Sequence, residues 1–253
     1  MIRTATDEDL KSMRPDSEAA VKILCLAEAY GLARSFLRFW CNEDRTLFMS
    51  LIDGVATIST ISDEPEVDFE ELGVFLSMQR DINIVRTSET VANGIVKHCG
   101  IDAEYGSVLT PGDGLKKPSE TPENLSPGEA YPLLKACFEG LPPFDSWYAD
   151  VSHRLRHGFC RIVGFRRDGI PVSCAMTTSE IHNAAVIGAV ATLEQARGKG
   201  YASSSVLTLA NDLINQGKKV FLSPKNCKAH ELYTGLGFAE CGRWANIKLL
   251  GRN

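Results

Sequence analysis

The strongest constraint on the fold is an apolar run that ends just before a glycine-containing turn and a helix. Residues Ala184 to Thr192 are small, β-branched or apolar, which predicts a buried strand. The turn Glu194–Ala202 follows directly, and it contains Gly198 and Gly200. Beyond it, apolar residues recur at helical spacing until Gly217 indicates a stop. These apolar residues are Val206, Leu209, Ala210 and Leu213.

The turn between this strand and this helix has the composition of an anion-binding site. Gly198 and Gly200 lack the Cβ atoms that would keep backbone N–H groups from closing around a ligand, and a helix N-terminus adds partial positive charge. We therefore predict that the turn binds phosphate, with a purely structural strand–glycine–helix junction as the alternative. Two other phosphate motifs fit less well. Gly200 stands where the Walker pattern needs Ser or Thr, and the third glycine of a Rossmann fingerprint is missing.

A second pattern lies further along the chain. Lys218 to Ser223 predicts a short strand, and Asn226 to Leu236 predicts a short helix. The apolar face of that helix consists of Ala229, Leu232, Tyr233 and Leu236. Gly237-Phe238 is then expected to turn the chain into a final strand pair. Upstream, residues 158–167 and 170–178 predict a hairpin across Asp168-Gly169.

Together the two patterns resemble the GNAT superfamily of acyl-CoA-dependent N-acyltransferases. The acyl-CoA loop of that family reads Gln/Arg-x-x-Gly-x-Gly/Ala, and here it is matched by Gln195, Gly198 and Gly200. Its later motif reads Asn-x-x-Ala-x-x-Leu-Tyr-x-x-x-Gly-Phe. That motif is matched by Asn226, Ala229, Leu232, Tyr233, Gly237 and Phe238. The resemblance covers roughly residues 157–249.

The resemblance implies an α+β (α/β) fold in which a mixed, mostly antiparallel twisted sheet is flanked by helices. It also implies an acetyl-CoA site in which backbone amides of residues 196–201 hold the pyrophosphate. The strand at residues 188–190 would pair with the pantetheine arm, and one of its N–H groups would polarise the thioester carbonyl. The implied cofactor-binding residues are Gly188, Ala189, Val190, Gln195, Ala196, Arg197, Gly198, Lys199, Gly200, Tyr201 and Asn226.

One catalytic side chain follows from the same resemblance. Tyr233 aligns with the family tyrosine that protonates the departing thiolate, and its alternative is a core tyrosine. Asn226 would hydrogen-bond the cofactor, or simply cap its helix. Glu180, His182 and Glu194 are candidates for the general base, and the sequence does not choose among them. The resemblance implies no metal.

The length of the chain requires a second unit. An acyltransferase domain of this kind needs about 150 residues, whereas the chain has 253. The region around residues 110–132 is rich in proline and glycine. We therefore predict a first unit at residues 1–115, a linker at 116–132 and an acetyl-CoA-binding domain at 133–253.

The first unit repeats the order of elements expected in the second. Residues 45–51 and 55–61 predict a hairpin across Asp53-Gly54, followed by an amphipathic helix containing Phe69, Leu72, Phe75 and Leu76. A strand at 82–85, a helix near 88–98 and a strand near 103–109 come next. Where the acyl-CoA loop would fall, residues 64–71 are acidic and would repel a phosphate. We interpret this unit as a degenerate acyltransferase-like repeat, with a family-specific α+β appendage as the alternative.

Charge and composition narrow the partners. Residues 1–110 contain 10 Lys+Arg against 19 Asp+Glu (net −9), and residues 111–253 contain 17 against 13 (net +4). The basic half suits an anionic ligand, and the acidic half argues against nucleic acid. No apolar stretch approaches the ~18 residues of a spanning helix, and the first residues lack a signal-peptide core, so we expect a cytoplasmic protein without a membrane partner. The eight cysteines contain no Cys-x-x-Cys pair, and most are expected to be reduced core residues.

The sequence thus predicts an N-acetyltransferase that moves an acetyl group from acetyl-CoA to a primary amine of a small or amino-acid-like molecule. Direct attack in a ternary complex is the expected route. The alternatives are a non-catalytic acyl-CoA sensor that docks a partner protein, and an aminoacyl or thiol-sugar acyltransferase of the tandem type. The acceptor, the acyl length and the oligomeric state are not indicated by the sequence.

Overall fold

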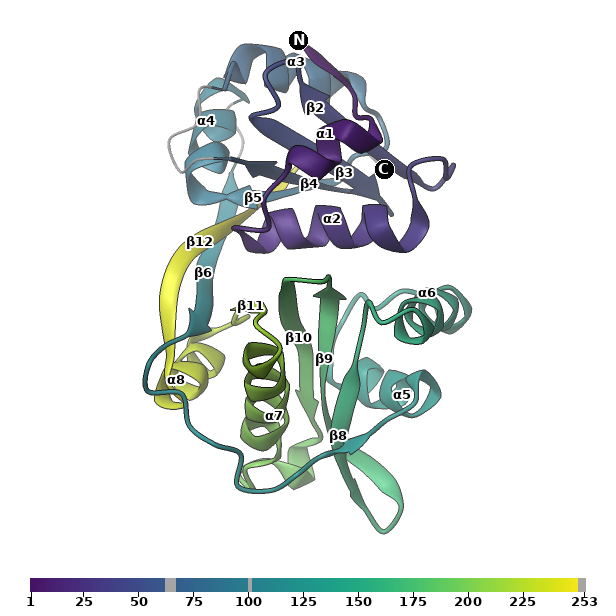
Figure 1. Ribbon diagram of the computed structural model, residues 1–253, viewed down its shortest axis with the longest axis vertical. Coiled ribbons are helices and arrows are strands. Elements are labelled where there is room, and N and C mark those ends of the chain that lie inside the picture. Colours follow the sequence, from purple (N-terminus) through teal and green to yellow (C-terminus); the bar gives the residue numbers. More distant parts are fainter. Residues whose placement is uncertain (62–66, 100–101, 250–253) are drawn as a thin grey trace. The chain divides into compact units, whose positions relative to one another are not determined.

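The computed structural model describes residues 1–61, 67–99 and 102–249 (Figure 1). The chain forms two compact units. Unit 1 consists of Met1–Val108 with Cys241–Asn253, and unit 2 consists of Leu109–Glu240. The strands β6 (Ala103–Pro111) and β12 (Phe238–Lys248) each contribute residues to both units. These bounds differ from the boundaries predicted at residues 115 and 133. The assignment of functions to the two predicted domains stays a prediction.

Unit 2 is a mixed sheet in the order β6-β11-β10-β9-β8-β7. Its neighbouring strands run antiparallel except for the parallel pair β10–β11. The strands are β7 (Glu123–Asn124), β8 (Ile162–Arg167), β9 (Ile170–Glu180), β10 (Ala184–Thr192) and β11 (Lys219–Leu222). The helices are α5 (Pro127–Cys137), α6 (Phe144–Arg156), the 3₁₀ turn η1 (Glu194–Ala196), α7 (Tyr201–Asn215) and α8 (Cys227–Gly235).

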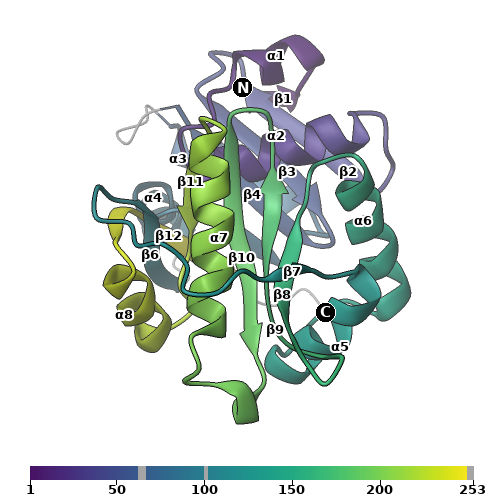
Figure 2. The same cartoon turned by 60° about the horizontal axis from the view of Figure 1, so that its bottom comes forward.

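Strand alternation assigns the two faces of this sheet to different helices. Val163 and Ala175 pack with the apolar side chains of α7 and α8, whereas Ile162 and Cys174 pack with those of α5 and α6. The segment before β7 crosses the outer side of α7, where Ser119 Oγ lies 3.0 Å from Ser204 Oγ (Figure 2). Both β7 and the start of α5 lie within the segment predicted as a linker.

Gly237 is required by a close approach of two backbone segments. Its φ is +99°, and a Cβ at this position would lie 2.3 Å from the carbonyl oxygen of Gly114. The predicted strand pair after Gly237-Phe238 is wrong: a single strand, β12, continues to Lys248 and pairs with β5 of unit 1. The reason is that the chain stays extended through Gly242, the only glycine between Phe238 and Lys248, so no reversing turn forms.

Unit 1 is a sheet in the order β1-β2-β3-β4-β5-β12, with β4–β5 as its parallel pair. Its strands are β1 (Ile2–Thr4), β2 (Leu37–Asn42), β3 (Leu47–Ile52), β4 (Val55–Thr60) and β5 (Ile84–Ser88). Its helices are α1 (Asp7–Ser12), α2 (Glu18–Tyr30), α3 (Phe69–Met78) and α4 (Glu89–Cys99). The core between the sheet and α3 and α4 contains Met49, Ile58, Leu72 and Ile95.

The two units share the order hairpin, helix, parallel strand and helix, with β3–β4 and β9–β10 as the corresponding hairpins. Each unit also has an Asp-Gly turn with both residues at positive φ, Asp53-Gly54 between β3 and β4 and Asp168-Gly169 between β8 and β9, so the two turns do not occupy corresponding positions. The predicted fold class of mixed, mostly antiparallel sheets flanked by helices is confirmed, as are the helices at α3 and α4. Residues 62–66, which include part of the predicted acidic loop, lie outside the described residues.

Elsewhere the structure adds elements that the sequence did not predict. The segment before residue 45 contains β1, α1, α2 and β2.

The described cysteines are free thiols, and Cys25, Cys41, Cys160 and Cys174 are buried. Cys227 and Cys241 are exposed, so the expectation of core positions fails for these two because both lie on solvent-facing parts of α8 and β12. None of the described helices is both long and apolar enough to cross a membrane.

Acid should weaken the hydrogen bonds that Glu129, in the first turn of α5, accepts from Ser126 and Arg166. Ser126 donates its backbone N–H and hydroxyl to Glu129, and Arg166 donates at 2.7 Å; these bonds lower the pKa of Glu129 to about 2. A lowered pKa in the folded state stabilises the protein above the ordinary pKa of the carboxyl group, and this contribution is lost as pH falls toward 2. Glu129→Gln should therefore reduce the urea midpoint at pH 7, with the difference from wild type shrinking between pH 5 and pH 3.

The matched control is Glu139→Gln, because Glu139 is exposed just after α5. This variant should follow the wild-type midpoint across the same pH range. A constant gap between Glu129→Gln and wild type down to pH 3 would contradict the assignment.

Candidate functional site

The site begins where two parallel strands part. β10 pairs with β11 from Ala184 to Ile187, whose partner is Leu222, and β11 ends there. Beyond this point the register between β10 and β9 shifts between Gly188 and Ala191, and Ala189 takes a φ of +49°. The last residues of β10 therefore keep β9 on one side and have no strand pairing on the other in the described chain. Their backbone groups on that edge are available to a ligand.

The turn after β10 presents a second set of free backbone groups. Gly198 and Gly200 have φ of +77° and +81°, and Gly200 caps α7 without a side-chain hydrogen bond. In the part of the chain that the structure describes, the amides of residues 198–203 donate no hydrogen bond. The expectation that the amides of residues 196–201 hold the pyrophosphate is wrong for the first two, because Ala196 and Arg197 donate to the carbonyls of Leu193 and Glu194 at 2.9 and 3.2 Å. A Cβ at Gly198 would meet nothing within 4 Å. This N-terminus has the geometry and the charge to bind an anion.

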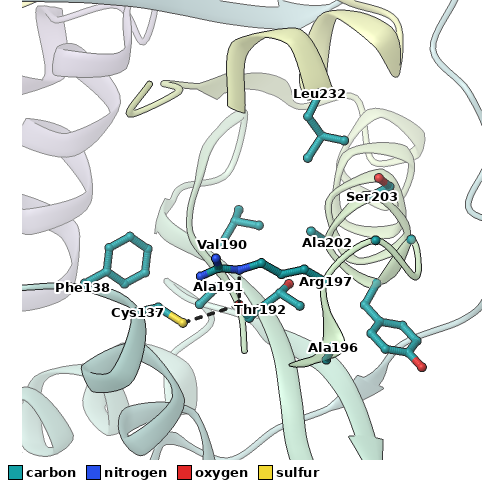
Figure 3. A pocket seen from close by; sticks show the side chains of 13 residues that line it. Cys137, Phe138, Val190, Ala191, Thr192, Ala196, Arg197, Ala202, Ser203 and Leu232 are labelled. Carbon is teal, nitrogen blue, oxygen red and sulfur yellow. Dashed lines mark hydrogen bonds between the residues drawn. The ribbon is translucent and has the colours of Figure 1, made fainter. Parts of the chain in front are cut away.

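The strand edge and the helix N-terminus border the same cavity, which has a volume of about 570 Å³ (Figure 3). It is lined by Cys137 and Phe138 at the end of α5, by Val190, Ala191 and Thr192 of β10, by Ala196, Arg197, Gly198 and Gly200 of the turn, by Tyr201, Ala202 and Ser203 of α7, and by Leu232 of α8.

The Thr192 carbonyl holds three walls of the cavity together. Arg197 Nε donates to this oxygen at 3.2 Å, and Cys137 Sγ donates to it at 3.7 Å (Figure 3). Nearby, the ring of Tyr201 stacks on Phe165 with centroids 4.9 Å apart. The Tyr201 hydroxyl oxygen accepts a hydrogen bond from Arg167 Nε. The end of α5, the end of β10 and the start of α7 are thereby fixed relative to one another.

The structure brings together about half of the predicted cofactor-binding residues. Those that line the cavity are Val190, Ala196, Arg197, Gly198, Gly200 and Tyr201. Those that do not are Gly188, Ala189, Gln195, Lys199 and Asn226. Asn226 caps α8, since its Oδ1 accepts the Ala229 N–H at 2.9 Å. Asn226 therefore has a structural role as a helix cap that needs no ligand.

Tyr233 lies beside the cavity but not in its lining. Its side chain is 6 % exposed, packs in the core beneath α7 and meets the Phe238 ring edge-on. Burial raises the pKa of Tyr233 to about 12. The preceding residue of α8, Leu232, reaches the cavity instead.

None of the three candidate bases lines the cavity. Glu180 is 2 % exposed and bonds Lys218 Nζ at 2.7 Å and Arg161 Nη2 at 2.5 Å, so it serves as the centre of a buried ion cluster. His182 and Glu194 are exposed. Within the described ranges, the cavity lining contains neither a carboxylate nor an imidazole.

Sequence reasoning missed several lining residues. Thr192, Ala202 and Ser203 could have been found, because they end the predicted strand and begin the predicted helix. Cys137, Phe138 and Leu232 carry no such signal, since tertiary packing alone brings them to the cavity. Among the residues described, no cluster of His, Cys, Asp or Glu could hold a metal ion.

The corresponding helix of unit 1 starts very differently. Asp68 caps α3 by accepting the Glu71 N–H at 2.9 Å, and Glu70 and Glu71 place two more carboxylates in the first turn. These carboxylates interact favourably with the positive end of the helix dipole, so the chain itself supplies the negative charge there. Unit 1 keeps the order of elements but not the free amides at the start of this helix.

Comparison with known proteins places this geometry in a family context. The FR47-like protein family model matches residues 162–247. No curated protein sequence matches the chain. Among solved structures, the chain is similar to a GCN5-related N-acetyltransferase from Kribbella flavida (20% identity, 92% of this chain and 96% of that chain, TM-score 0.63). It is also similar to a GCN5-related N-acetyltransferase from Sphaerobacter thermophilus (15% identity, 98% of this chain and 95% of that chain, TM-score 0.65). A third similar structure is a tandem GNAT protein from the clavulanic acid biosynthesis pathway (15% identity, 98% of this chain and 97% of that chain, TM-score 0.62).

The recognition made from the sequence is confirmed. Residues 162–247 carry the FR47-like match, and the chain has the fold of the GNAT acetyltransferases, including that of a tandem member. At these identities the structural likeness shows the fold alone, so the activity has to be argued from the cavity.

The two interpretations of Asn226 can be separated. Asn226→Ala should cost about 1 kcal/mol of folding free energy through loss of the cap, while the affinity for acetyl-CoA changes less than about twofold. Asn226→Ser, which can still cap, should restore most of the stability. Denaturant unfolding and calorimetric titration measure the two effects. A large loss of affinity without a loss of stability would show that Asn226 binds the ligand.

Proposed function

We propose that the protein is an acyl-CoA-dependent N-acyltransferase that transfers an acyl group, acetyl in the simplest case, to a primary amine of a small or amino-acid-like molecule. One observation carries this proposal. A vacant strand edge and an uncapped helix N-terminus border one cavity, and an acyl-CoA offers an amide-containing arm for the first and a pyrophosphate for the second. A cytoplasmic location stays a prediction.

The residues of the cavity divide the work of binding. The free amides of residues 198–203 would hold the pyrophosphate, and Arg197 and Lys199 add positive charge at that end. The edge of β10 beyond Ile187 would pair with the amides of the pantetheine arm. A β10 N–H directed at the thioester carbonyl would stabilise the oxygen as charge develops on it, an effect commonly worth ~3 kcal/mol.

The amine then attacks the thioester carbonyl carbon directly, and the carbon–sulfur bond breaks. Tyr233 is our candidate to protonate the departing sulfur. Because burial keeps its pKa at about 12, the phenol retains its proton at neutral pH. The amine must lose a proton, and since the described lining contains no carboxylate or imidazole, we assign that proton to solvent water.

A second function is favoured by that same lining. A cavity that binds acyl-CoA without an ionisable base beside it, and with Tyr233 packed in the core, also suits a non-catalytic acyl-CoA sensor. The sensor predicts binding without consumption of thioester for every amine tried. The aminoacyl and thiol-sugar alternatives of the tandem type have no such specific support, and a donor screen separates them.

Calorimetric titration with acetyl-CoA tests the proposed site. Wild type should bind at micromolar concentration, and Gly198→Glu/Gly200→Glu should lose binding because two carboxylates face the phosphate position. Gly158→Glu/Gly169→Glu is the matched control: these glycines have φ of +80° and +78° and open surroundings, so the strain and charge are the same. Equal binding by both double variants would contradict the site, and no binding to wild type would contradict the function.

Replacing the proposed acid tests its role. Tyr233→Phe should lower kcat by about 10²-fold, while the Kd for acetyl-CoA changes less than about twofold, because the ring remains packed against Phe238. Tyr131→Phe removes a hydroxyl that bonds the Pro142 carbonyl at 2.8 Å and serves as the control with normal kcat. Steady-state kinetics and calorimetry supply the two readouts. An equal loss of affinity in Tyr233→Phe would make the tyrosine structural.

A further inference from the structure

The wall of the cavity contains one aromatic side chain from the end of α5. Phe138 is the C-cap residue of α5, and it lines the cavity. Lys225 follows Leu222, the last residue of β11, by three positions, and its ammonium lies 5.7 Å from the centroid of the Phe138 ring. This contact links the Phe138 wall of the cavity to the segment that follows β11.

The walls around that point are apolar. In Figure 3 the side chains of Phe138 and Leu232 lie on either side of Val190. Phe138 is only half-buried and packs against a buried apolar cluster that contains Leu134, Cys174 and Ala191. The apolar surroundings of Phe138 therefore extend from the cavity wall into this core.

The orientation of the donor follows from the proposed function, on which this inference rests. The free amides that suit phosphate lie after Thr192, at the C-terminal end of β10. A donor whose arm follows β10 away from those amides brings its acyl group toward the strand separation. The acyl group therefore meets Val190, Leu232 and Phe138.

The charges near Phe138 favour an uncharged acyl group over a protonated amine. The described lining contains no carboxylate to balance an ammonium group, and the cation Lys225 lies over the Phe138 ring. A protonated acceptor would be repelled here, whereas methylene groups gain by leaving water. An apolar acyl chain is the ligand fragment that fits.

We propose that Phe138 determines which acyl groups the protein accepts: its ring, in the wall of the cavity, limits the acyl chain to a short one. Lys225 acts as a positioning residue that holds the ring through the cation–π contact. A smaller side chain at position 138 would widen the cavity at this wall.

The test compares Kd values for acetyl-CoA and hexanoyl-CoA by calorimetry without any acceptor, so that no turnover is needed. Wild type should prefer acetyl-CoA. In Phe138→Ala the ratio Kd(hexanoyl)/Kd(acetyl) should fall at least about tenfold, because several methylene groups gain an apolar site. Phe138→Leu, a milder change, should give an intermediate ratio.

Two further variants sharpen the result. Lys225→Met keeps an aliphatic chain but removes the charge, and it should lower the ratio in the same direction by a smaller factor. Phe144→Ala is the control, because Phe144 is an aromatic residue that is 44 % exposed and does not line the cavity. Its ratio should equal that of wild type.

The outcomes separate this inference from the function beneath it. Normal acetyl-CoA binding with an unchanged ratio in both Phe138→Ala and Phe138→Leu would overturn the role of Phe138 and leave the proposed function standing. A wild type that prefers hexanoyl-CoA would also overturn it. A wild type that binds neither thioester would contradict the proposed function, and this inference with it.

Discussion

The functional architecture of unit 2 depends on the parting of two parallel strands. β11 ends at Leu222 while β10 continues past Ile187 through a register shift, so one edge of the half-buried end of β10 is left without a neighbouring strand in the described chain. Unpaired backbone groups inside a protein are costly unless a partner supplies their hydrogen bonds. The uncapped N-terminus of α7 presents the same demand a few residues later. A single extended ligand with amides and a pyrophosphate would supply hydrogen bonds to both, which is why the cavity, rather than the fold, supports the proposed activity.

The two units differ most clearly at the N-terminus of the helix that follows the hairpin. Both follow a hairpin with a helix and a parallel strand, and both pair their parallel strands over only a few residues. In unit 1, however, Asp68 occupies the first-turn amide that a ligand would need. Carboxylates at a helix N-terminus stabilise that helix and exclude a phosphate. The start of α3 in unit 1 is thus stabilised by side chains of the chain itself.

Local patterns predicted the elements well and the walls of the site poorly. The β-branched run at 184–192 coincides with β10, and the Asp-Gly turns form as expected, because both signals depend on neighbours in sequence. Phe138 and Leu232 reach the cavity through tertiary packing, which no local pattern encodes. Tyr233 was chosen from a motif, yet the motif does not distinguish a residue that lines a cavity from one that packs beneath it. The end of β11, which opens the cavity, is likewise a consequence of where the chain turns into α8.

The most direct test of the central claim is to observe the amides themselves. Amide proton and nitrogen chemical shifts of the wild-type protein, recorded by NMR during titration with CoA, report which backbone groups acquire a ligand. The account predicts the largest changes at residues 198–203 and along residues 188–192, with the amides of residues 69–71 in unit 1 unchanged. Large changes confined to other parts of the chain, or none at all at saturating CoA, would contradict it.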